Sequence, residues 1–138
     1  HSFRRVLFRS WMTTLEIARD VPLAPLTSLE LGGPAKYFVR ACDETTLVEA
    51  LRWSADREMP SAILAGGSNL IVPDEGYDGL VVQMAIDALD FREGGTVSAG
   101  AGVAWEKVVD GAVNGVATVV RETSIPDRNA ARGLSPTA

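Results

Sequence analysis

The sequence predicts an α+β fold, and three observations lead to this class. Apolar residues recur at helical spacing in two stretches, residues 44–58 and 103–113. Shorter runs of β-branched or alternating apolar residues, bounded by glycine and proline, predict five strands. Their order (strand, helix, four strands, helix) is not a regular βαβ repeat, and it is therefore typical of an α+β domain.

The N-terminal part begins with an atypical stretch. Residues 1–11 hold three arginines, no acidic residue and no initiating methionine. We predict a non-native leader followed by a true start at Met12, and a native arm is the alternative. Residues 20–34 contain three prolines and a Gly-Gly pair, which predicts an extended segment that ends in a turn.

The first strand and the first helix are predicted from residues 36–60. Apolar and polar residues alternate over 36–42, as expected of a strand. Asp43 is a favourable N-cap for a helix over 44–58, and Pro60 stops that helix. The apolar positions expected on its buried face are Leu47, Val48, Leu51 and Ala55.

The remaining strands are short and lie around two glycine-containing loops. Residues 61–64 and 69–72 are predicted as strands on either side of the first loop. Residues 79–84 predict another strand, and residues 96–102 begin as a strand and turn at their glycines. The helix over 103–113 is expected to bury Val103, Val108, Val109 and Ala112.

Composition excludes several classes of function. The net charge of −5 argues against a general nucleic-acid binder, which needs a basic face. Cys42 and His1 are the only cysteine and histidine, so an internal disulfide, a multi-cysteine zinc site and a histidine-based triad are excluded. No apolar run approaches the about 20 residues that a membrane-spanning helix needs. The 138 residues, 46% of them hydrophobic, can form one domain or part of one.

The two loops, Ala65–Asn69 and Ala99–Gly102, suggest an anion-binding site. Glycine lacks a Cβ, so a ligand can approach the backbone closely, and successive amide N–H groups can converge on an anion. Ser68 and Asn69 add side-chain donors, and the second loop is expected to open a helix near Val103, whose first amides favour an anion. Two such loops in one small domain suggest a diphosphate, as in a dinucleotide.

Other interpretations of these residues stay open. Neither loop matches G-x-G-x-x-G or a P-loop, and their glycines can serve a hairpin turn or close packing. Trp53 and Trp105 are expected to be core aromatics, and Cys42 a buried small hydrophobe. The acidic segment 73–79 is expected to be a solvated turn, since it lacks the spacing of a calcium loop. No nucleophile–base pair is found, so a non-catalytic α+β module is an alternative.

Three segments, in order, resemble the UDP-N-acetylenolpyruvoylglucosamine reductase (MurB) family. Residues 22–38, "PLAPLTSLELGGPAKYF", are similar to its T-x-x-x-GGPA segment. Residues 64–82, "LAGGSNLIVPDEGYDGLVV", resemble its G-x-GSN-L loop, and residues 97–109, "VSAGAGVAWEKVV", resemble its V-x-AGAG-x-x-W stretch. The resemblance extends over residues 20–117 and corresponds to the N-terminal, FAD-binding part of that family.

The resemblance implies the FAD-binding fold of the vanillyl-alcohol-oxidase (PCMH) type, in which two small α+β subdomains hold FAD between them. These would be residues 12–85 and an incomplete 86–138. FAD is expected to bind non-covalently, because neither loop contains a histidine or cysteine. Ala65 replaces a glycine that is usual in the family. The first loop would cradle the pyrophosphate, and the residues implied to bind the cofactor are Ala65, Gly66, Gly67, Ser68, Asn69, Leu70, Gly100, Ala101, Gly102 and Ile125.

The implied activity is the NADPH-dependent reduction of UDP-N-acetylglucosamine enolpyruvate to UDP-N-acetylmuramate. This reaction belongs to peptidoglycan precursor synthesis, on which cell shape and cell division depend. The serine and glutamate that act on the substrate, and the domain that binds the nucleotide sugar, would lie beyond residue 138. We therefore expect an inactive N-terminal fragment without a catalytic residue of its own. Another FAD-linked oxidoreductase of the same fold is the alternative.

The C-terminal residues depart from the family pattern. Within 124–138, Ile125 and Pro126 fit the family's next flavin-binding stretch, but Asp127 stands in place of a glycine. We interpret residues 123–138 as aberrant, as a frame error or truncation would produce. The resemblance also implies a monomer in the bacterial cytoplasm, with a nucleotide-sugar substrate and neither nucleic acid nor membrane as partner.

Overall fold

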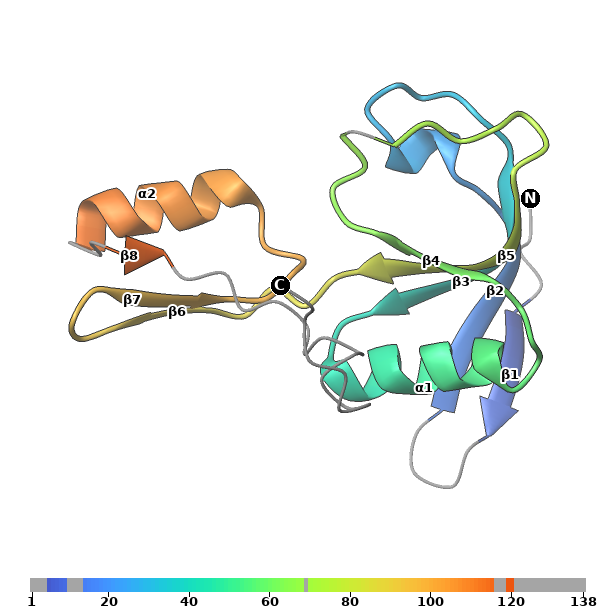
Figure 1. Ribbon diagram of the computed structural model, residues 1–138, viewed down its shortest axis with the longest axis horizontal. Coiled ribbons are helices and arrows are strands. Elements are labelled where there is room, and N and C mark those ends of the chain that lie inside the picture. The colour runs from blue at the N-terminus through green and yellow to red at the C-terminus, as the bar shows by residue number, and fades with distance from the viewer. Residues whose placement is uncertain (1–4, 10–13, 69, 116–118, 121–138) are drawn as a thin grey trace, which may run out of the picture. The chain divides into compact units, whose positions relative to one another are not determined.

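The computed structural model describes residues 5–9, 14–68, 70–115 and 119–120, and it contains two compact units (Figure 1). The first unit is formed by His1–Asp87 with Gly100–Ala104, and the second by Ala88–Ala99 with Trp105–Ala138. Each unit combines a sheet with one α-helix, so the α+β class is confirmed. The boundaries expected at residues 11 and 85 stay predictions. No helix within the described ranges is long and apolar enough to cross a membrane.

The first unit is built on a mixed sheet in which three parallel strands end at the same edge. Strands β3, β5 and β4 are mutually parallel, with Ala41 beside Met84 and Leu64 beside Gln83. Strands β1 and β2 extend the sheet on the β3 side in antiparallel fashion. The strand order is β1 (Arg5–Arg9), β2 (Thr14–Pro22), β3 (Pro34–Ala41), β5 (Tyr77–Met84) and β4 (Ser61–Leu64).

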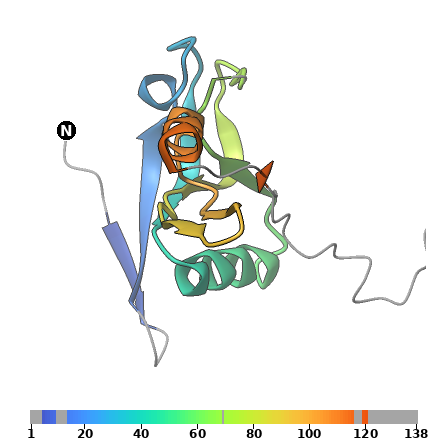
Figure 2. The same cartoon turned by 90° about the vertical axis from the view of Figure 1, so that its left-hand side faces the viewer.

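This sheet is covered on both faces, so the interior strand β5 is buried throughout its middle. Helix α1 (Glu44–Ala55) covers one face, and segments 23–33 and 65–76 cover the other (Figures 1 and 2). Segment 23–33 includes a short 3₁₀ helix, η1 (Ala24–Leu26). The core beneath α1 contains Leu15, Ile17, Val39, Ala41, Ala50, Leu80 and Val82. The core beneath the loops contains Leu23, Ala35, Leu64, Val72 and Val81.

Helix α1 confirms the predicted helix but ends at Ala55, three residues before the predicted end. The chain then turns, because Glu58 adopts a φ of 50° and its amide bonds back to Ala55. Of the predicted face, Leu47 and Leu51 pack against the core, whereas Val48 is 43% exposed. Ala50 and Ser54 are the helix residues that are fully buried, and Ala55 is exposed.

Asp43 is the predicted N-cap, and its effect on stability can be tested by pH. Its Oδ1 accepts a hydrogen bond from the Thr46 amide at 2.7 Å, which lowers the pKa of Asp43 below the usual 3.8. Because the folded-state pKa is depressed, the stabilisation is present above the unfolded pKa and is lost as pH falls through the folded one. Asp43→Ala should therefore lower the melting temperature at pH 7, and the deficit should shrink near pH 3.

Asp43→Asn is the matched control, because it keeps a side-chain acceptor and removes only the ionisation. Its melting temperature should lie closer to that of the wild type at pH 7. Thermal melts followed by circular dichroism at both pH values measure these differences. An alanine deficit that is equally large at pH 3 and pH 7 would contradict a role for the ionised cap.

The strands predicted over 36–42, 61–64 and 79–84 are confirmed as β3, β4 and β5. The strand predicted over 69–72 is wrong for residues 70–72, which adopt no regular structure; Asn69 lies outside the described residues. β5 already pairs with β4, so residues 70–72 do not add a strand beside it. The stretch instead lies against segment 31–34, where the Gly33 amide donates to the Pro73 carbonyl at 2.8 Å. Val72 is buried there, whereas Ile71 is 81% exposed.

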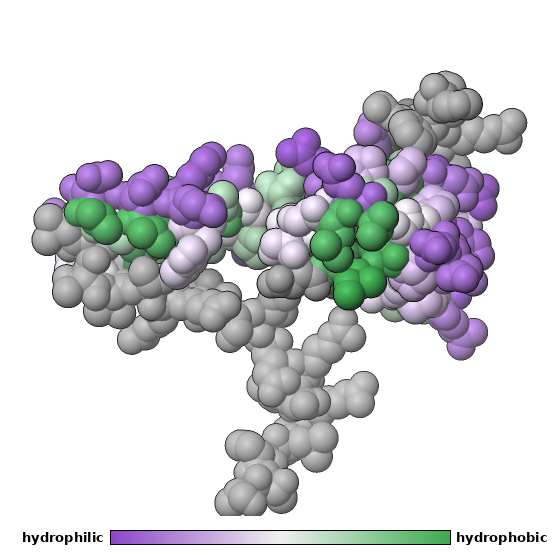
Figure 3. Space-filling view, turned by 90° about the horizontal axis from the view of Figure 1, so that it is seen from above, coloured by the Kyte–Doolittle hydropathy of each residue, from purple (hydrophilic) through white to green (hydrophobic). Residues whose placement is uncertain are grey.

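Strand β2 and helix η1 are absent from the predicted elements. The sequence predicts only an extended segment over 20–34, but the strand begins at Thr14 and places Leu15 and Ile17 in the core. Segment 23–33 also carries exposed apolar side chains at Leu29 and Leu31. Figure 3 views the molecule from this side and shows apolar surface gathered on the first unit.

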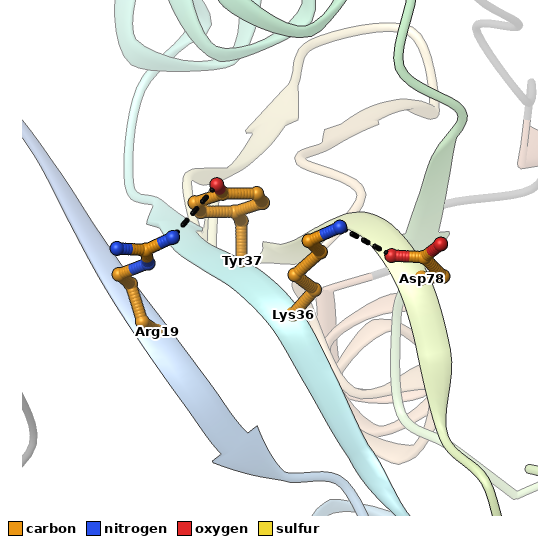
Figure 4. Close-up of polar contacts among 4 residues, drawn as sticks. All are labelled: Arg19, Lys36, Tyr37 and Asp78. Carbon is orange, nitrogen blue, oxygen red and sulfur yellow. Dashed lines mark hydrogen bonds and ion pairs between the residues drawn. The ribbon is translucent and has the colours of Figure 1, made fainter.

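Polar side chains link neighbouring strands on the surface of the first unit (Figure 4). Arg19 on β2 donates from Nη2 to the Tyr37 hydroxyl on β3 at 3.0 Å. Lys36 Nζ on β3 lies 2.7 Å from Asp78 Oδ1 on β5, and this hydrogen bond raises the pKa of Lys36. Both partners are exposed, so the ion pair contributes little to stability. It bridges the strands at the irregularity between Ala35 and Tyr37.

The second unit contains a three-stranded sheet and helix α2 (Trp105–Gly115). Its strands, in the order β6-β7-β8, are Leu89–Arg92, Thr96–Ala99 and Val119–Val120. Strand β7 confirms the prediction for residues 96–99, and β6 was not predicted. Helix α2 begins two residues later than predicted and ends at Gly115 instead of residue 113.

The buried face predicted for α2 is confirmed at Val108 and wrong at Val109, and the prediction of Trp105 as a core aromatic is also wrong. Val108 is 3% exposed, whereas Trp105 is 62% exposed and Val109 is 40% exposed. The paired strands β6 and β7 are only four residues long, and a Cβ on Gly111 would lie 2.0 Å from Cζ of Phe91. The helix therefore packs closely at its middle, and Trp105 at its first position is left exposed.

Candidate cofactor-binding site

The first glycine loop lies at the carboxyl edge of the parallel strands. Ala65 follows β4 directly, and the preceding residue, Leu64, pairs with Gln83 near the end of β5. Ligands of open α/β sheets bind outside the carboxyl ends of parallel strands. The position of this loop in the fold is therefore suited to a ligand.

Gly67 is a glycine that the fold itself requires. Its φ is +70°, a region that residues with a Cβ rarely adopt. A Cβ at this position would lie 2.2 Å from the Leu26 carbonyl oxygen, and the Gly67 carbonyl accepts a hydrogen bond from the Ser28 amide at 3.1 Å. The loop therefore rests directly on the backbone of residues 26–28.

Gly66 differs from Gly67, because neither conformation nor packing requires a glycine there. Its φ lies outside the positive region, and a Cβ would meet no atom within 4 Å. The open space beside Gly66 is therefore available to a bound group. Ala65 also lies outside the positive-φ residues, so alanine in place of the family's usual glycine causes no backbone strain there.

The amides of the first loop are suited to an anion. Among the described residues, no protein acceptor pairs with the N–H groups of Gly66, Gly67 or Ser68. Ser68 and Leu70 are exposed, and Asn69 lies outside the described residues. Successive amides without protein partners, beside a position that lacks a Cβ, are the arrangement that binds phosphate groups through the backbone. The loop therefore fits a diphosphate.

The second glycine loop is explained by close packing. A Cβ on Gly100 would lie 2.3 Å from the Ile86 carbonyl oxygen, and one on Gly102 would lie 2.8 Å from the Ala85 Cα. The Gly102 amide donates to the Ile86 carbonyl at 2.8 Å, and the Val103 amide donates to the Gly100 carbonyl at 3.0 Å. The expectation of a helix that opens with a free amide at Val103 is therefore wrong, because this amide is paired and α2 begins at Trp105.

The sheet nevertheless brings both loops to the same edge. Ala85 and Ile86, on which the second loop packs, follow the end of β5, and Ala65 follows the end of the neighbouring β4. Ala101 is exposed at the tip of the second loop. Ile125, also predicted to bind the cofactor, lies outside the described residues.

The close packing of Gly32 and Gly33 against the segment that follows the first loop was not predicted. The pair Gly32–Gly33 was interpreted as a turn. However, a Cβ on Gly33 would lie 2.2 Å from the Asp74 carbonyl oxygen, and a Cβ on Gly32 would lie 2.4 Å from the Val72 carbonyl oxygen. The T-x-x-x-GGPA segment thus packs backbone to backbone against segment 71–76. The adjacent glycines were the only signal of this packing.

Two other predictions concern possible reactive or metal-binding groups. Cys42 is exposed, and the prediction of a buried cysteine is wrong, because β3 ends at Ala41, the last residue of the strand that points into the core. The acidic segment forms an exposed turn over residues 73–76, in which the Gly76 amide donates to the Pro73 carbonyl, whereas residues 77–79 of the predicted turn belong to β5. Across the described residues, no group of three acidic, cysteine or histidine side chains could hold a metal ion.

Comparisons with known proteins identify the family of this chain. Residues 35–127, more than half of the chain, match the family described as FAD binding domain. The UDP-N-acetylenolpyruvoylglucosamine reductase of Cutibacterium acnes is 41% identical over 101 residues, which cover 70% of this chain and 27% of the relative.

Two further relatives carry the same name. That of Saccharopolyspora erythraea is 45% identical over 91 residues, covering 63% of this chain and 25% of the relative. The reductase of Thermobifida fusca is 38% identical over 121 residues, which cover 83% of this chain and 34% of the relative. The chain spans about a quarter to a third of these curated relatives. The predicted resemblance to the N-terminal, FAD-binding part of these reductases is confirmed, and the chain belongs to the FAD binding domain family.

Proposed function

We propose that this chain binds FAD non-covalently and supplies the FAD-binding part of a UDP-N-acetylenolpyruvoylglucosamine reductase. The family match over residues 35–127 and the names of the relatives support this function. The observation that carries it is Gly66, a glycine with open space around its missing Cβ, at the carboxyl edge of the parallel strands. A ligand that approaches the backbone there accounts for the absence of a side chain.

In this proposal the first loop holds the diphosphate of FAD. The amides of Gly66, Gly67 and Ser68 donate to phosphate oxygens. Converging backbone amides can bind these anionic oxygens without a positively charged side chain. The flanking residues Ala65, Asn69 and Leu70 complete the loop. Gly100, Ala101 and Gly102 belong to the same edge of the sheet, and Ile125 stays a predicted contact.

The activity of the whole enzyme is part of the same proposal. Bound FAD supplies hydride-transfer chemistry, and the residues of this chain bind and orient it. NADPH is the proposed co-substrate, and the enolpyruvyl nucleotide sugar of peptidoglycan synthesis is the proposed substrate. The residues that act on the substrate are proposed to lie outside this chain. A monomeric protein of the bacterial cytoplasm, without nucleic-acid or membrane partners, is the proposed setting.

Gly66→Ala tests the proposal, because it adds one methyl group where the protein itself has room. We expect FAD affinity to fall about tenfold, as a steric overlap of 1–3 kcal/mol with the bound ligand implies. The melting temperature of the free protein should stay unchanged, since no protein atom lies within 4 Å of the new Cβ. Titration with FAD, followed by quenching of flavin fluorescence, measures the affinity.

Ala65→Gly is the matched control, because it changes the neighbouring residue of the same loop without adding atoms. It should bind FAD about as tightly as the wild type. Equal affinities of Gly66→Ala and the wild type would contradict the placement of the ligand at this loop. A wild-type chain that does not bind FAD at all would contradict the proposed function.

A further inference from the structure

The turn at residues 26–28 lies directly against the proposed diphosphate loop. The Ser28 amide donates to the Gly67 carbonyl at 3.1 Å, and the backbone of Leu26 and Thr27 occupies the space where a Gly67 Cβ would stand. Segments far apart in the sequence thus meet through their main chains. The conformation of Gly67 therefore depends on the position of this turn.

The hydrogen bond from Ser28 also sets the direction of the next amide in the loop. No described peptide bond is cis, and in a trans peptide the C=O and the following N–H point in opposite directions. Because the Gly67 carbonyl points at Ser28, the Ser68 N–H points away from residues 26–28. Ser68 is exposed, and no acceptor among the described residues pairs with this amide.

The turn is itself firmly held. The Leu26 amide donates to the Leu23 carbonyl at 2.9 Å, and Leu23 is 2% exposed. Thr27 is a buried polar residue, 5% exposed, and both its amide and its hydroxyl donate to the Ala24 carbonyl at 3.1 Å. A buried hydroxyl that pairs with the backbone of its own turn fixes that turn.

We propose that the Leu26–Ser28 turn is a positioning element for the diphosphate contact of FAD. Through the Ser28 amide it orients the Gly67–Ser68 peptide so that the Ser68 N–H faces the ligand, and the Thr27 hydroxyl holds the turn in place. The inference rests on the proposed function and adds residues that touch no cofactor atom themselves. It assigns to residues 26–28 a role in ligand binding as well as in packing.

Ser28→Pro is the direct test, because proline lacks the N–H that holds the Gly67 carbonyl. The backbone tolerates proline here: the Glu30 amide bonds to the Thr27 carbonyl, so Ser28 is the second residue of a turn, a position that proline favours. Thr27 is extended, with φ −122° and ψ 152°, as the residue before a proline must be. Ser28→Ala is the matched control, because it removes the hydroxyl and keeps the amide.

The affinities of the full chain for FAD and for ADP decide the proposal. ADP carries the diphosphate without the flavin, so Ser28→Pro should weaken both ligands about tenfold, whereas Ser28→Ala stays within about twofold of the wild type. The melting temperature of the free protein should be similar in Ser28→Ala and the wild type. It should be lower in Ser28→Pro, because the proline ring takes the place of the amide hydrogen that faces the Gly67 carbonyl, so both affinities are measured well below the unfolding transition of this variant. Unchanged affinities in Ser28→Pro, or loss of FAD binding without loss of ADP binding, would overturn the positioning role.

A second pair of variants decides the matter if Ser28→Pro does not fold. Thr27→Val removes the buried hydroxyl at similar volume and should weaken both ligands severalfold, and Thr27→Ser should restore them. Equal ligand affinities of Thr27→Val and the wild type would overturn the proposal. A wild-type chain that binds neither FAD nor ADP contradicts the proposed function itself, and the positioning role falls with it.

Discussion

Replacing Gly67 by alanine is expected to abolish measurable FAD binding and to lower the free energy of unfolding by about 2–4 kcal/mol. Left-handed backbone costs a residue with a Cβ about 1–2 kcal/mol, and forcing extra atoms into a packed site costs about 1–3 kcal/mol. Both costs apply, since Gly67 has a φ of +70° and its Cβ would lie 2.2 Å from the Leu26 carbonyl oxygen. Relief of either would move the Gly67–Ser68 peptide away from Ser28.

Urea unfolding followed by circular dichroism measures the stability of Gly67→Ala, and flavin fluorescence measures its affinity. Gly66→Ala is the natural comparison, because it places the same methyl group one residue earlier in open space. The two variants should thus differ in their effects: Gly66→Ala loses only FAD affinity, whereas Gly67→Ala loses both FAD affinity and stability. A Gly67→Ala protein as stable as the wild type would show that the loop does not rest on residues 26–28.

The regular elements of the fold follow from local patterns in the sequence. Alternation over 36–42 corresponds to β3, and helical spacing with Asp43 as N-cap corresponds to α1. The run over 79–84, rich in β-branched residues, corresponds to β5, whose residues 80–82 are buried on both faces of the sheet. These patterns predict structure well because they record which residues face a core.

The errors arise where structure depends on partners distant in the sequence. Residues 70–72 have the composition of a strand, but the neighbouring strands are already paired and the stretch contacts segment 31–34 instead. Trp105 occupies the first position of α2, where a sheet of four-residue strands leaves it exposed. Neither the available partner nor the extent of a sheet can be derived from a local pattern.

The candidate site was predictable in its location but not in the role of each glycine. Both loops contain glycines after strands, and the sequence cannot distinguish a glycine that faces a ligand from one that packs against a backbone. The structure distinguishes the two kinds. Atoms of Ala85 and Ile86 occupy the space where a Cβ on Gly100 or Gly102 would stand, whereas the space beside Gly66 is open. Such a distinction requires knowledge of which backbone lies opposite each glycine.

Leu80→Ala is the second variant with a large expected effect, a loss of about 3 kcal/mol in the free energy of unfolding. Leu80 is fully buried on β5, in the core beneath α1, so truncation removes apolar contacts and leaves a cavity that the sheet cannot close. Val48→Ala on α1 is the matched control, because Val48 is 43% exposed and should lose less than about 1 kcal/mol. Urea unfolding of both variants measures the difference.

The same variant separates stability from binding. β5 lies between β3 and β4, and the residues that follow it, Ala85 and Ile86, support the second loop. Leu80 itself lies in the core on the α1 face, far in the fold from the loops that cover the opposite face. In the folded population of Leu80→Ala, the FAD affinity should therefore stay within about threefold of the wild type, since the large loss is one of global stability. A selective loss of affinity with little loss of stability would contradict this separation, because it would show that Leu80 acts on the loops and not on global stability.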